Sequence, residues 1–215
     1  MTLPERKSYE HAYELAYKLA SEQLAKIDDI EQQCRKSGAH YQVIDSKRVI
    51  TVEYLNQPYL ITLPDIEISL KGSAERVPMR DKALILHYFI SAKGTLSANK
   101  LITFRELPEG SVYFPTFAQR TSQPLLNHFG NAPHILVDTA EKLGGHEADY
   151  GDAAVTINAF IRVPITIILW RGDNELAPQG NMVFDATISD YLATEDITVL
   201  CEIITWRLIR YSKEA

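Results

Sequence analysis

The spacing of apolar residues changes abruptly near residue 40, and this change restricts the chain to folds that combine helices with antiparallel strands. Before it, apolar side chains recur every three or four positions, as on one face of a helix. They are Tyr9, Tyr13, Ala16, Ala20, Leu24, Ile27 and Ile30. Gly38 can adopt the left-handed conformation that ends a helix. The pattern predicts helix over residues 3–37, as one long piece or two abutting pieces.

From Tyr41 to Leu70 the apolar period becomes two, which is typical of strands. The β-rich runs are short, and turn-forming groups such as Asn56-Gln57-Pro58 separate them. Such short connections join neighbouring strands as hairpins, so the sheet is expected to be antiparallel. The predicted strands are 41–44, 49–54, 59–63 and 66–70.

The rest of the chain alternates between the two patterns, without an internal repeat or a flexible linker. We therefore predict an α+β fold, with antiparallel sheets packed against several helices, a long N-terminal helix and a C-terminal helix. We expect one domain over residues 1–215. The further predicted elements are a helix from Met79 to Ser91, a strand over 101–107, helical pieces over 113–143, a β-hairpin of 153–160 and 165–170, a short helix near Phe184 and a last helix capped by Thr194.

The composition places the chain among ordinary globular proteins, with 46% apolar and 23% charged residues. No apolar run approaches the roughly 18–20 residues that cross a bilayer, and the charged start lacks the apolar stretch of a secretory signal. The two cysteines, Cys34 and Cys201, are too few for a disulfide framework and suit small core residues. A cytoplasmic location without membrane contact is expected.

Charge is unevenly divided along the chain. Residues 1–107 hold 15 lysines and arginines against 14 acidic residues, whereas residues 108–215 hold 7 against 14. An acidic half repels phosphate backbones, so nucleic acid is not expected as a partner. This half is either a solvated surface or a face that meets a cation, a metal or a basic protein.

Two histidines are candidate metal ligands, because a neutral imidazole suits axial coordination. His87 lies within an apolar helical segment, where it is alternatively a core histidine with satisfied hydrogen bonds. His128 lies at the end of a predicted helix, where it alternatively interacts with the helix dipole. The strong short motifs for phosphate, zinc, calcium and serine hydrolase sites do not occur.

Polar groups that follow strands supply the other candidates. Arg105, at the end of the predicted strand 101–107, can clamp a carboxylate or phosphate, and period two sends it to the face opposite Glu106. Alternatively, Arg105 is a charge on an edge strand or forms a buried ion pair with the acidic half. Asp173 and Glu175, after the strand that ends at Trp170, can bind a hard cation or transfer protons. Asp173 equally suits an ordinary turn in which its carboxylate binds nearby backbone.

A series of short segments follows one order along nearly the whole chain. They are Leu84–Tyr88, Thr103–Leu107, Tyr113 with Phe117 and Arg120, Pro124-Leu125, Phe129-Gly130, Gly144-Gly145, Gly151-Asp152, Trp170–Glu175, Phe184-Asp185, Tyr191-Leu192 and Glu195-Asp196. This ordered series resembles the family called domain of unknown function 3786, found in anaerobic bacteria and archaea. The family resemblance implies a setting in corrinoid and iron–sulfur one-carbon metabolism. The loop 174–178 departs from the more acidic loop expected for the family. The chain also lacks cysteines for a cluster and lacks the usual Asp-x-His-x-x-Gly corrinoid motif.

Together these observations give one expected function and two alternatives. The expected function is that of a binding or accessory protein for a tetrapyrrole-like metallocofactor, corrinoid or haem, in anaerobic one-carbon or electron-transfer metabolism. A corrinoid or iron–sulfur protein is then a candidate partner. The alternatives are an acidic protein-docking module and a small acid–base enzyme that uses Asp173 and Glu175; no catalytic residue is otherwise assigned. The expected cofactor-binding residues are His87, His128, Arg105, Arg120, Tyr113 and Trp170, and the expected metal ligands are His87, His128, Asp173 and Glu175.

Overall fold

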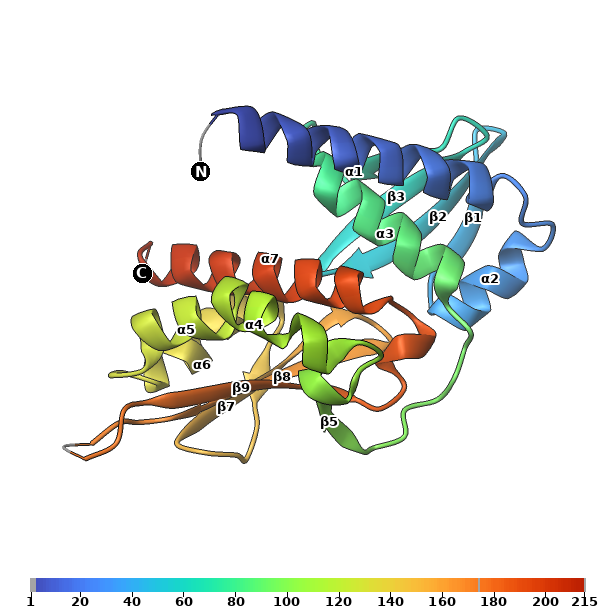
Figure 1. Ribbon diagram of the computed structural model, residues 1–215. Helices are drawn as coiled ribbons and strands as arrows, with labels where there is room; N and C mark the ends of the chain where they lie inside the picture. The colour runs from blue at the N-terminus through green and yellow to red at the C-terminus, as the bar shows by residue number, and fades with distance from the viewer. Residues whose placement is uncertain (1–2, 174, 215) are drawn as a thin grey trace. The chain divides into compact units, whose positions relative to one another are not determined.

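The computed structural model describes residues 3–173 and 175–214, with side chains from residue 9 onward. The chain forms two compact units (Figure 1). Unit 1 comprises residues 1–95 and 190–192, and unit 2 comprises residues 96–189 and 193–215. Helices and antiparallel strands occur in both, which confirms the α+β class. The single domain over 1–215 stays a prediction.

The sheet of unit 1 is an antiparallel meander in which each strand pairs with the next. Alternate side chains of its strands are buried, as period two requires. Ile50, Val52 and Tyr54 face the core from one strand, while the strand beside it buries Tyr59 and Ile61. The expected hairpins are confirmed. The strands are β1 (His40–Ile44), β2 (Lys47–Tyr54), β3 (Gln57–Leu63) and β4 (Glu67–Leu70).

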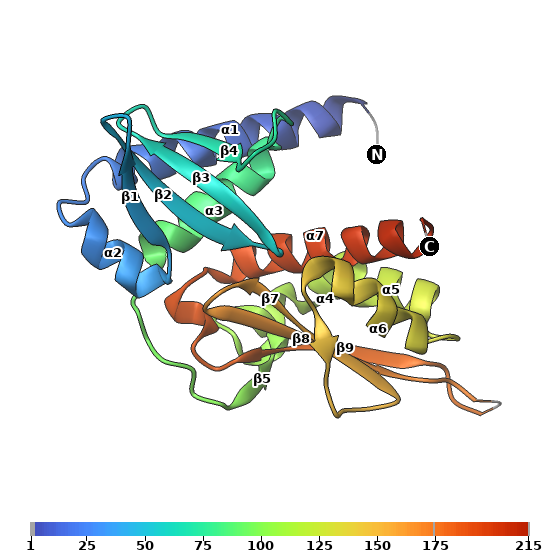
Figure 2. The same ribbon diagram turned by 180° about the vertical axis from the view of Figure 1, so that it is seen from behind.

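Three helical segments complete the described part of unit 1, namely α1 (Leu3–Leu24), α2 (Ile30–Ser37) and α3 (Met79–Ser91). Helix α3 contacts β2, and α1 packs along α3 on the same side of the sheet (Figures 1 and 2). Gly38 ends α2 in the left-handed conformation, with φ of 72°, as expected. The predicted helix over residues 3–37 is therefore two helices.

Gln33 of helix α2 caps the C-terminal end of the neighbouring helix α3. Its side-chain amide donates to the carbonyl oxygens of Phe89, at 2.6 Å, and Ala92, at 3.1 Å. These carbonyls lie where a helix has no partners of its own for its last oxygens. Because Gln33 is buried, it replaces water at this helix end.

Unit 2 is built on a second antiparallel arrangement of strands, in which β7, β8, β9 and β5 are neighbours in that order and β6 pairs with β7. The predicted hairpin of 153–160 and 165–170 is confirmed, with its second strand starting at Val163. Residues such as Val155, Ile167 and Phe184 are fully buried in this sheet. The strands are β5 (Leu101–Thr103), β6 (His146–Glu147), β7 (Ala153–Phe160), β8 (Val163–Trp170) and β9 (Gln179–Asp185).

The helices of unit 2 pack on this sheet and on one another. Helix α5 contacts β9, α6 contacts β7, and α7 contacts α4, α5 and α6. The helical pieces expected over 113–143 are present and begin at Gly110. The helices are α4 (Gly110–Arg120), α5 (Ser122–Phe129), α6 (His134–Ala140) and α7 (Thr194–Ser212), with short 3₁₀ turns η1 (Phe104–Glu106), η2 (Glu141–Leu143) and η3 (Ile188–Asp190).

Three local predictions were wrong. The strand over 101–107 stops at Thr103, because the Glu106 carboxylate accepts from the backbone N–H and hydroxyl of Thr103 and closes the 3₁₀ turn η1. Arg105 and Glu106 therefore do not lie on opposite faces of a strand. The segment around Phe184 belongs to β9 instead of a helix, since it pairs with β8. Thr194 is the first residue of α7, and its hydroxyl donates to the carbonyl of Pro108 at 2.7 Å.

The carboxylate of Asp185, at the end of β9, holds the loop before β5 in place through hydrogen bonds. One carboxylate oxygen accepts from the Ser97 hydroxyl at 2.6 Å and the Asn99 N–H at 2.9 Å. The other accepts from the Ala98 N–H at 3.1 Å, and from the Thr187 N–H and hydroxyl at 3.0 and 2.6 Å. Burial acts to raise the pKa of this carboxyl, but the hydrogen bonds outweigh it and hold the pKa far below its usual range.

Helix α7 buries residues on most of its circumference between Ile197 and Ile209. Cys201 is fully buried there, and Cys34 is buried in α2, so both cysteines are core residues as expected. Thr205 is also fully buried, and its hydroxyl has no hydrogen-bond partner among the residues that the structure describes. This hydroxyl is a local cost to stability, because it has left water without gaining a partner.

Candidate functional site

The predicted site residues fall in both units. His87 lies on α3 of unit 1, while Arg105, Tyr113, Arg120, His128, Trp170, Asp173 and Glu175 belong to unit 2. His87 is half-buried between fully buried neighbours on its helix. The role of His87 as a metal ligand stays a prediction.

Arg105 is packed against an aromatic ring. Its guanidinium lies over the ring of Phe114, 3.6 Å from the centroid, which is a favourable cation–π arrangement. Phe114 follows Tyr113 on α4, and the Tyr113 side chain is exposed. Helix α4 and the turn η1 thus bring Arg105 and Tyr113 to one part of unit 2.

Arg120, in the last turn of α4, forms an ion pair with Glu202 of α7. Its Nε donates to Glu202 Oε2 at 3.0 Å, and one terminal nitrogen donates to the same oxygen. Both side chains are partly buried, with 31% and 21% of their surfaces exposed. The pair therefore ties α4 to α7, and Glu202 engages the Nε and one terminal nitrogen of the Arg120 guanidinium.

The loop between β8 and β9 uses Asp173 for its own turn. The carboxylate accepts from the backbone N–H of Glu175 at 2.8 Å and of Leu176 at 2.7 Å. These hydrogen bonds lower the pKa of Asp173, so the group is ionised at neutral pH. The alternative role of Asp173, in which its carboxylate binds nearby backbone in an ordinary turn, accounts for this geometry. Trp170, at the end of β8, is partly exposed, and Asn174 lies outside the described residues.

His128 has the most site-like surroundings of the predicted residues. A surface hollow of about 280 Å³ lies between α5 and α7, lined by Pro124, Asn127, His128, Trp206 and Ile209. We call it the α5–α7 hollow. Trp206 is 52% exposed, although the helix that carries it is mostly buried. The hollow thus combines an imidazole, an indole, an amide and two aliphatic groups on an open surface.

Ser212 holds the imidazole of His128 in place. The His128 Nε2 lies 2.5 Å from the Ser212 Oγ, which joins α5 to the last turn of α7. The Ser212 hydroxyl donates to the carbonyl oxygen of Ile209 at 3.0 Å. Burial, and secondly the charge of Lys213, lower the pKa of His128. The imidazole is therefore neutral at neutral pH.

Sequence reasoning named His128 but missed Ser212, Trp206 and Asn127. Ser212 is 84 residues from His128, and only the packing of α5 on α7 brings the two together. The sequence did contain one indication of the α7 residues of the site. Trp206, Ile209 and Ser212 recur every three residues, which places them near one face of a helix.

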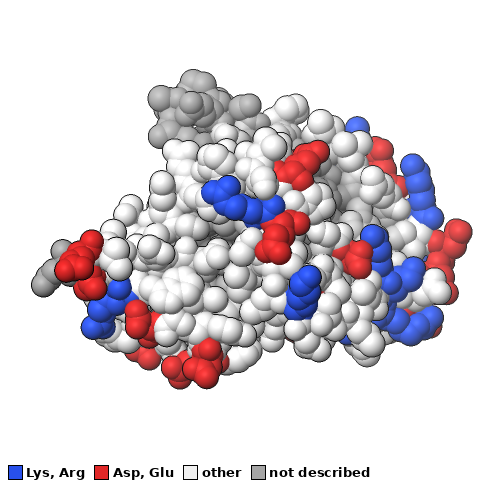
Figure 3. Space-filling view, turned by 60° about the horizontal axis from the view of Figure 1, so that its bottom comes forward, with Lys and Arg blue, Asp and Glu red and all other residues white. Residues whose placement is uncertain are grey.

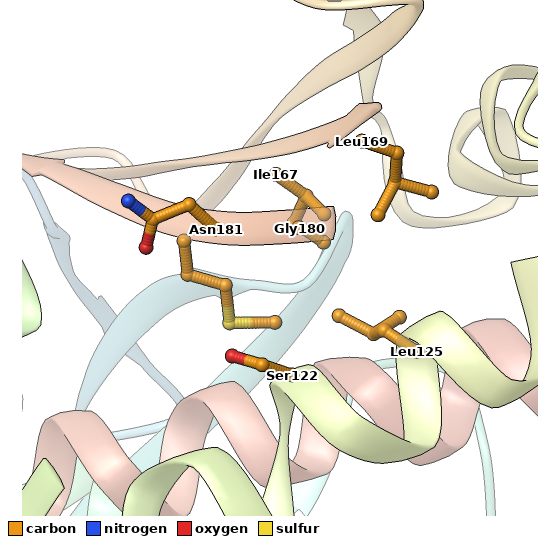
Figure 4. Close-up of a pocket in the computed structure, with 7 residues that line it drawn as sticks. Ser122, Leu125, Ile167, Leu169, Gly180 and Asn181 are labelled. Atoms are coloured by element: carbon orange, nitrogen blue, oxygen red, sulfur yellow. The ribbon is translucent and has the colours of Figure 1, made fainter. Parts of the chain in front are cut away.

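Unit 2 also contains an internal gap between helix α5 and the sheet, which differs from the open α5–α7 hollow. Figure 4 shows Ser122 and Leu125 of α5 directed toward Ile167, Leu169 and Gly180 of the sheet. The gap between them has no room for a water molecule. It belongs to the contact between helix and sheet and offers no space for a ligand.

Charged side chains are mixed on the face drawn in Figure 3, where acidic and basic groups are interspersed among a majority of other residues. Across residues 3–173 and 175–214, no three His, Cys, Asp or Glu side chains gather as a set that could hold a metal ion. Within the same residues, no helix has the length and apolar character needed to cross a membrane.

Comparison with protein families gives a match over most of the chain. The model of the family described as Domain of unknown function (DUF3786) matches residues 29–207. This range includes the α5 side of the α5–α7 hollow and Trp206, and it stops before Ser212. Neither the curated proteins nor the solved structures contain a match.

Proposed function

Because the chain belongs to the DUF3786 family, whose name carries no activity, we propose a function from the chemistry of its own residues. The protein binds a tetrapyrrole-like metallocofactor, a corrinoid or haem, at the α5–α7 hollow. His128 is the axial ligand in this proposal. The observation that carries it is the imidazole of His128, which Ser212 holds at the rim of the open α5–α7 hollow.

The lining of the hollow suits a flat, largely apolar ring. The exposed indole of Trp206 offers an aromatic surface for stacking, and Pro124 and Ile209 add aliphatic contacts. A neutral imidazole supplies the lone pair that an iron or cobalt centre accepts. With its 280 Å³, the hollow lies just below the usual range of roughly 300–1,000 Å³ for ligand pockets. It therefore covers only part of the cofactor and leaves the rest accessible.

The ion pair of Arg120 and Glu202 lies close to this hollow along α7. Glu202 is four residues before Trp206, which is one helical turn on the same side of the helix. A carboxylate side group of haem that reaches this turn can replace Glu202 as the partner of Arg120. Arg105 and Tyr113, on η1 and α4, are further candidates for contacts with side groups of the ring.

A cofactor that stays partly uncovered suits an accessory role in which the protein takes up a cofactor and passes it on. The receiver in this proposal is a corrinoid or iron–sulfur protein of anaerobic one-carbon or electron-transfer metabolism in the cytoplasm. The geometry gives less support to acid–base chemistry at Asp173 and Glu175, because Asp173 is engaged in its turn. The proposed role is binding and not catalysis.

Spectroscopic titration tests the proposal. Purified protein is titrated with ferric haem and, separately, with aquacobalamin while the visible absorption bands are followed. Coordination by His128 shifts these bands, and H128A abolishes the shift. The matched control is H87A, which changes the half-buried histidine of unit 1 and leaves the shift intact. Unchanged bands with both cofactors, or a shift that survives in H128A, would contradict the proposal.

A further inference from the structure

We infer that Ser212 is a positioning residue that fixes the tautomer of His128, so that Nε2 carries the proton and Nδ1 is the atom offered to a metal. The assignment of the tautomer follows from hydrogen bonds within the chain. The role of Nδ1 as the ligand atom rests on the proposed function.

The protons available to Ser212 and His128 determine the direction of the hydrogen bond between them. Ser212 has one hydroxyl proton, and the carbonyl oxygen of Ile209, 3.0 Å away, can only accept a hydrogen bond. This carbonyl lies three residues earlier on α7, where a serine near a helix end commonly donates to the backbone. With its proton directed to Ile209, the Ser212 oxygen can only accept from His128. The His128 Nε2, at 2.5 Å, therefore carries a hydrogen.

The second nitrogen of the ring is then the basic one. A neutral imidazole has one N–H and one lone pair, so a proton on Nε2 leaves the lone pair on Nδ1. Among the residues that the structure describes, none donates a hydrogen bond to Nδ1 of His128. The ring also packs edge-on against Phe129, with centroids 4.7 Å apart, which restricts its rotation.

This arrangement is that of a metal-binding histidine, whose other nitrogen usually donates to a neighbouring acceptor. Such a neighbour orients the ring and makes its free nitrogen a better ligand. Loss of the neighbour typically weakens metal affinity by about 10–100-fold. Ser212 thus determines which atom of His128 binds the metal and how firmly the ring is held.

The first test needs no cofactor. Long-range ¹H–¹⁵N correlation spectra of the histidine side chains, at neutral pH, report which ring nitrogen carries hydrogen, and H128Q assigns the signal. We expect wild type to show His128 protonated at Nε2 alone, and S212A to show a mixture of both tautomers. An Nε2 without hydrogen in wild type would overturn the inference, because Ser212 would then donate to the ring as a nucleophile does to its base.

The second test repeats the titration with ferric haem. S212A is expected to weaken binding by about 10–100-fold, and S212T, which keeps a hydroxyl, to restore it. Equal affinities for wild type and S212A would overturn the role of Ser212. The two tests separate the proposals: the expected tautomer without haem binding refutes the function alone, whereas haem binding by His128 with the opposite tautomer refutes this inference alone.

Discussion

Replacement of Asp185 by asparagine should destabilise unit 2 more than its small change in size suggests. Asparagine has nearly the same shape, but its amide nitrogen takes the place of one carboxylate oxygen and donates instead of accepting. If that nitrogen faces Ser97 and Asn99, the Ser97 hydroxyl can rotate to accept, whereas the Asn99 N–H is left facing another donor. The opposite orientation places two backbone N–H groups, of Ala98 and Thr187, against the amide.

The size of the effect follows from these bonds. A hydrogen bond to a charged group contributes about 1.5–3 kcal/mol, and a buried N–H without a partner costs about 1–3 kcal/mol. One orphaned N–H together with the weakening of the remaining bonds gives a loss of about 3 kcal/mol for D185N. The melting temperature should then fall by about 6–12 °C, since 1 kcal/mol corresponds to about 2–4 °C in a chain of this size.

The effect should also depend on pH. Because the pKa of Asp185 is lowered in the folded protein, its ionisation stabilises the fold fully above the ordinary value of 3.8 and progressively less as pH falls below it. Asparagine does not titrate, so the difference in unfolding free energy between wild type and D185N should shrink below about pH 4. Urea unfolding at pH 7 and pH 3.5 measures this difference.

A matched control is D138N, which changes an exposed aspartate on α6 and should alter stability by less than about 0.5 kcal/mol. A loss of less than about 1 kcal/mol in unfolding free energy for D185N at pH 7, or an equal loss at both pH values, would contradict this role of Asp185.

Three further substitutions test the packing, each by urea unfolding. T205V should stabilise the protein by about 1 kcal/mol, because the buried hydroxyl of Thr205 has no partner among the described residues; a loss of stability would indicate a bonded hydroxyl. G130A should cost about 1–3 kcal/mol, since a Cβ on Gly130 would lie 2.5 Å from the carbonyl oxygen of Leu126 and 2.9 Å from Pro178. An unchanged stability would mean that these contacts relax freely. Q33L should cost about 2 kcal/mol by leaving carbonyls such as that of Phe89 without a donor, whereas a neutral effect would show that water replaces the amide.

The hairpins of both units could be predicted from the sequence because local turn chemistry and period two agree there. The strand around Phe184 could not, because buried residues such as Met182, Val183 and Phe184 occupy both faces of β9 and erase the alternation. The end of β5 at Thr103 depends on one side-chain contact from Glu106, which no periodic pattern encodes.

The candidate site was predictable only in part for a related reason. Histidine chemistry singled out His128, but its surroundings come from α7, far along the chain. The exposure of a side chain cannot be deduced from spacing alone, so the sequence did not show that the Trp206 indole is exposed beside His128. The position of Arg120 next to Glu202 likewise depends on how α4 meets α7. Residue type suggests what a side chain can do, whereas packing decides what it meets.

The two buried cysteines give each unit its own internal probe. Cys34 belongs to unit 1 and Cys201 to unit 2, and neither forms a disulfide. Burial raises the pKa of Cys34 to about 11 and that of Cys201 still further from reactivity. Since only an exposed thiolate reacts with a thiol reagent, labelling of each cysteine records the opening of the structure around it. Mass spectrometry of the labelled peptides can thus show whether the two units unfold together or one before the other.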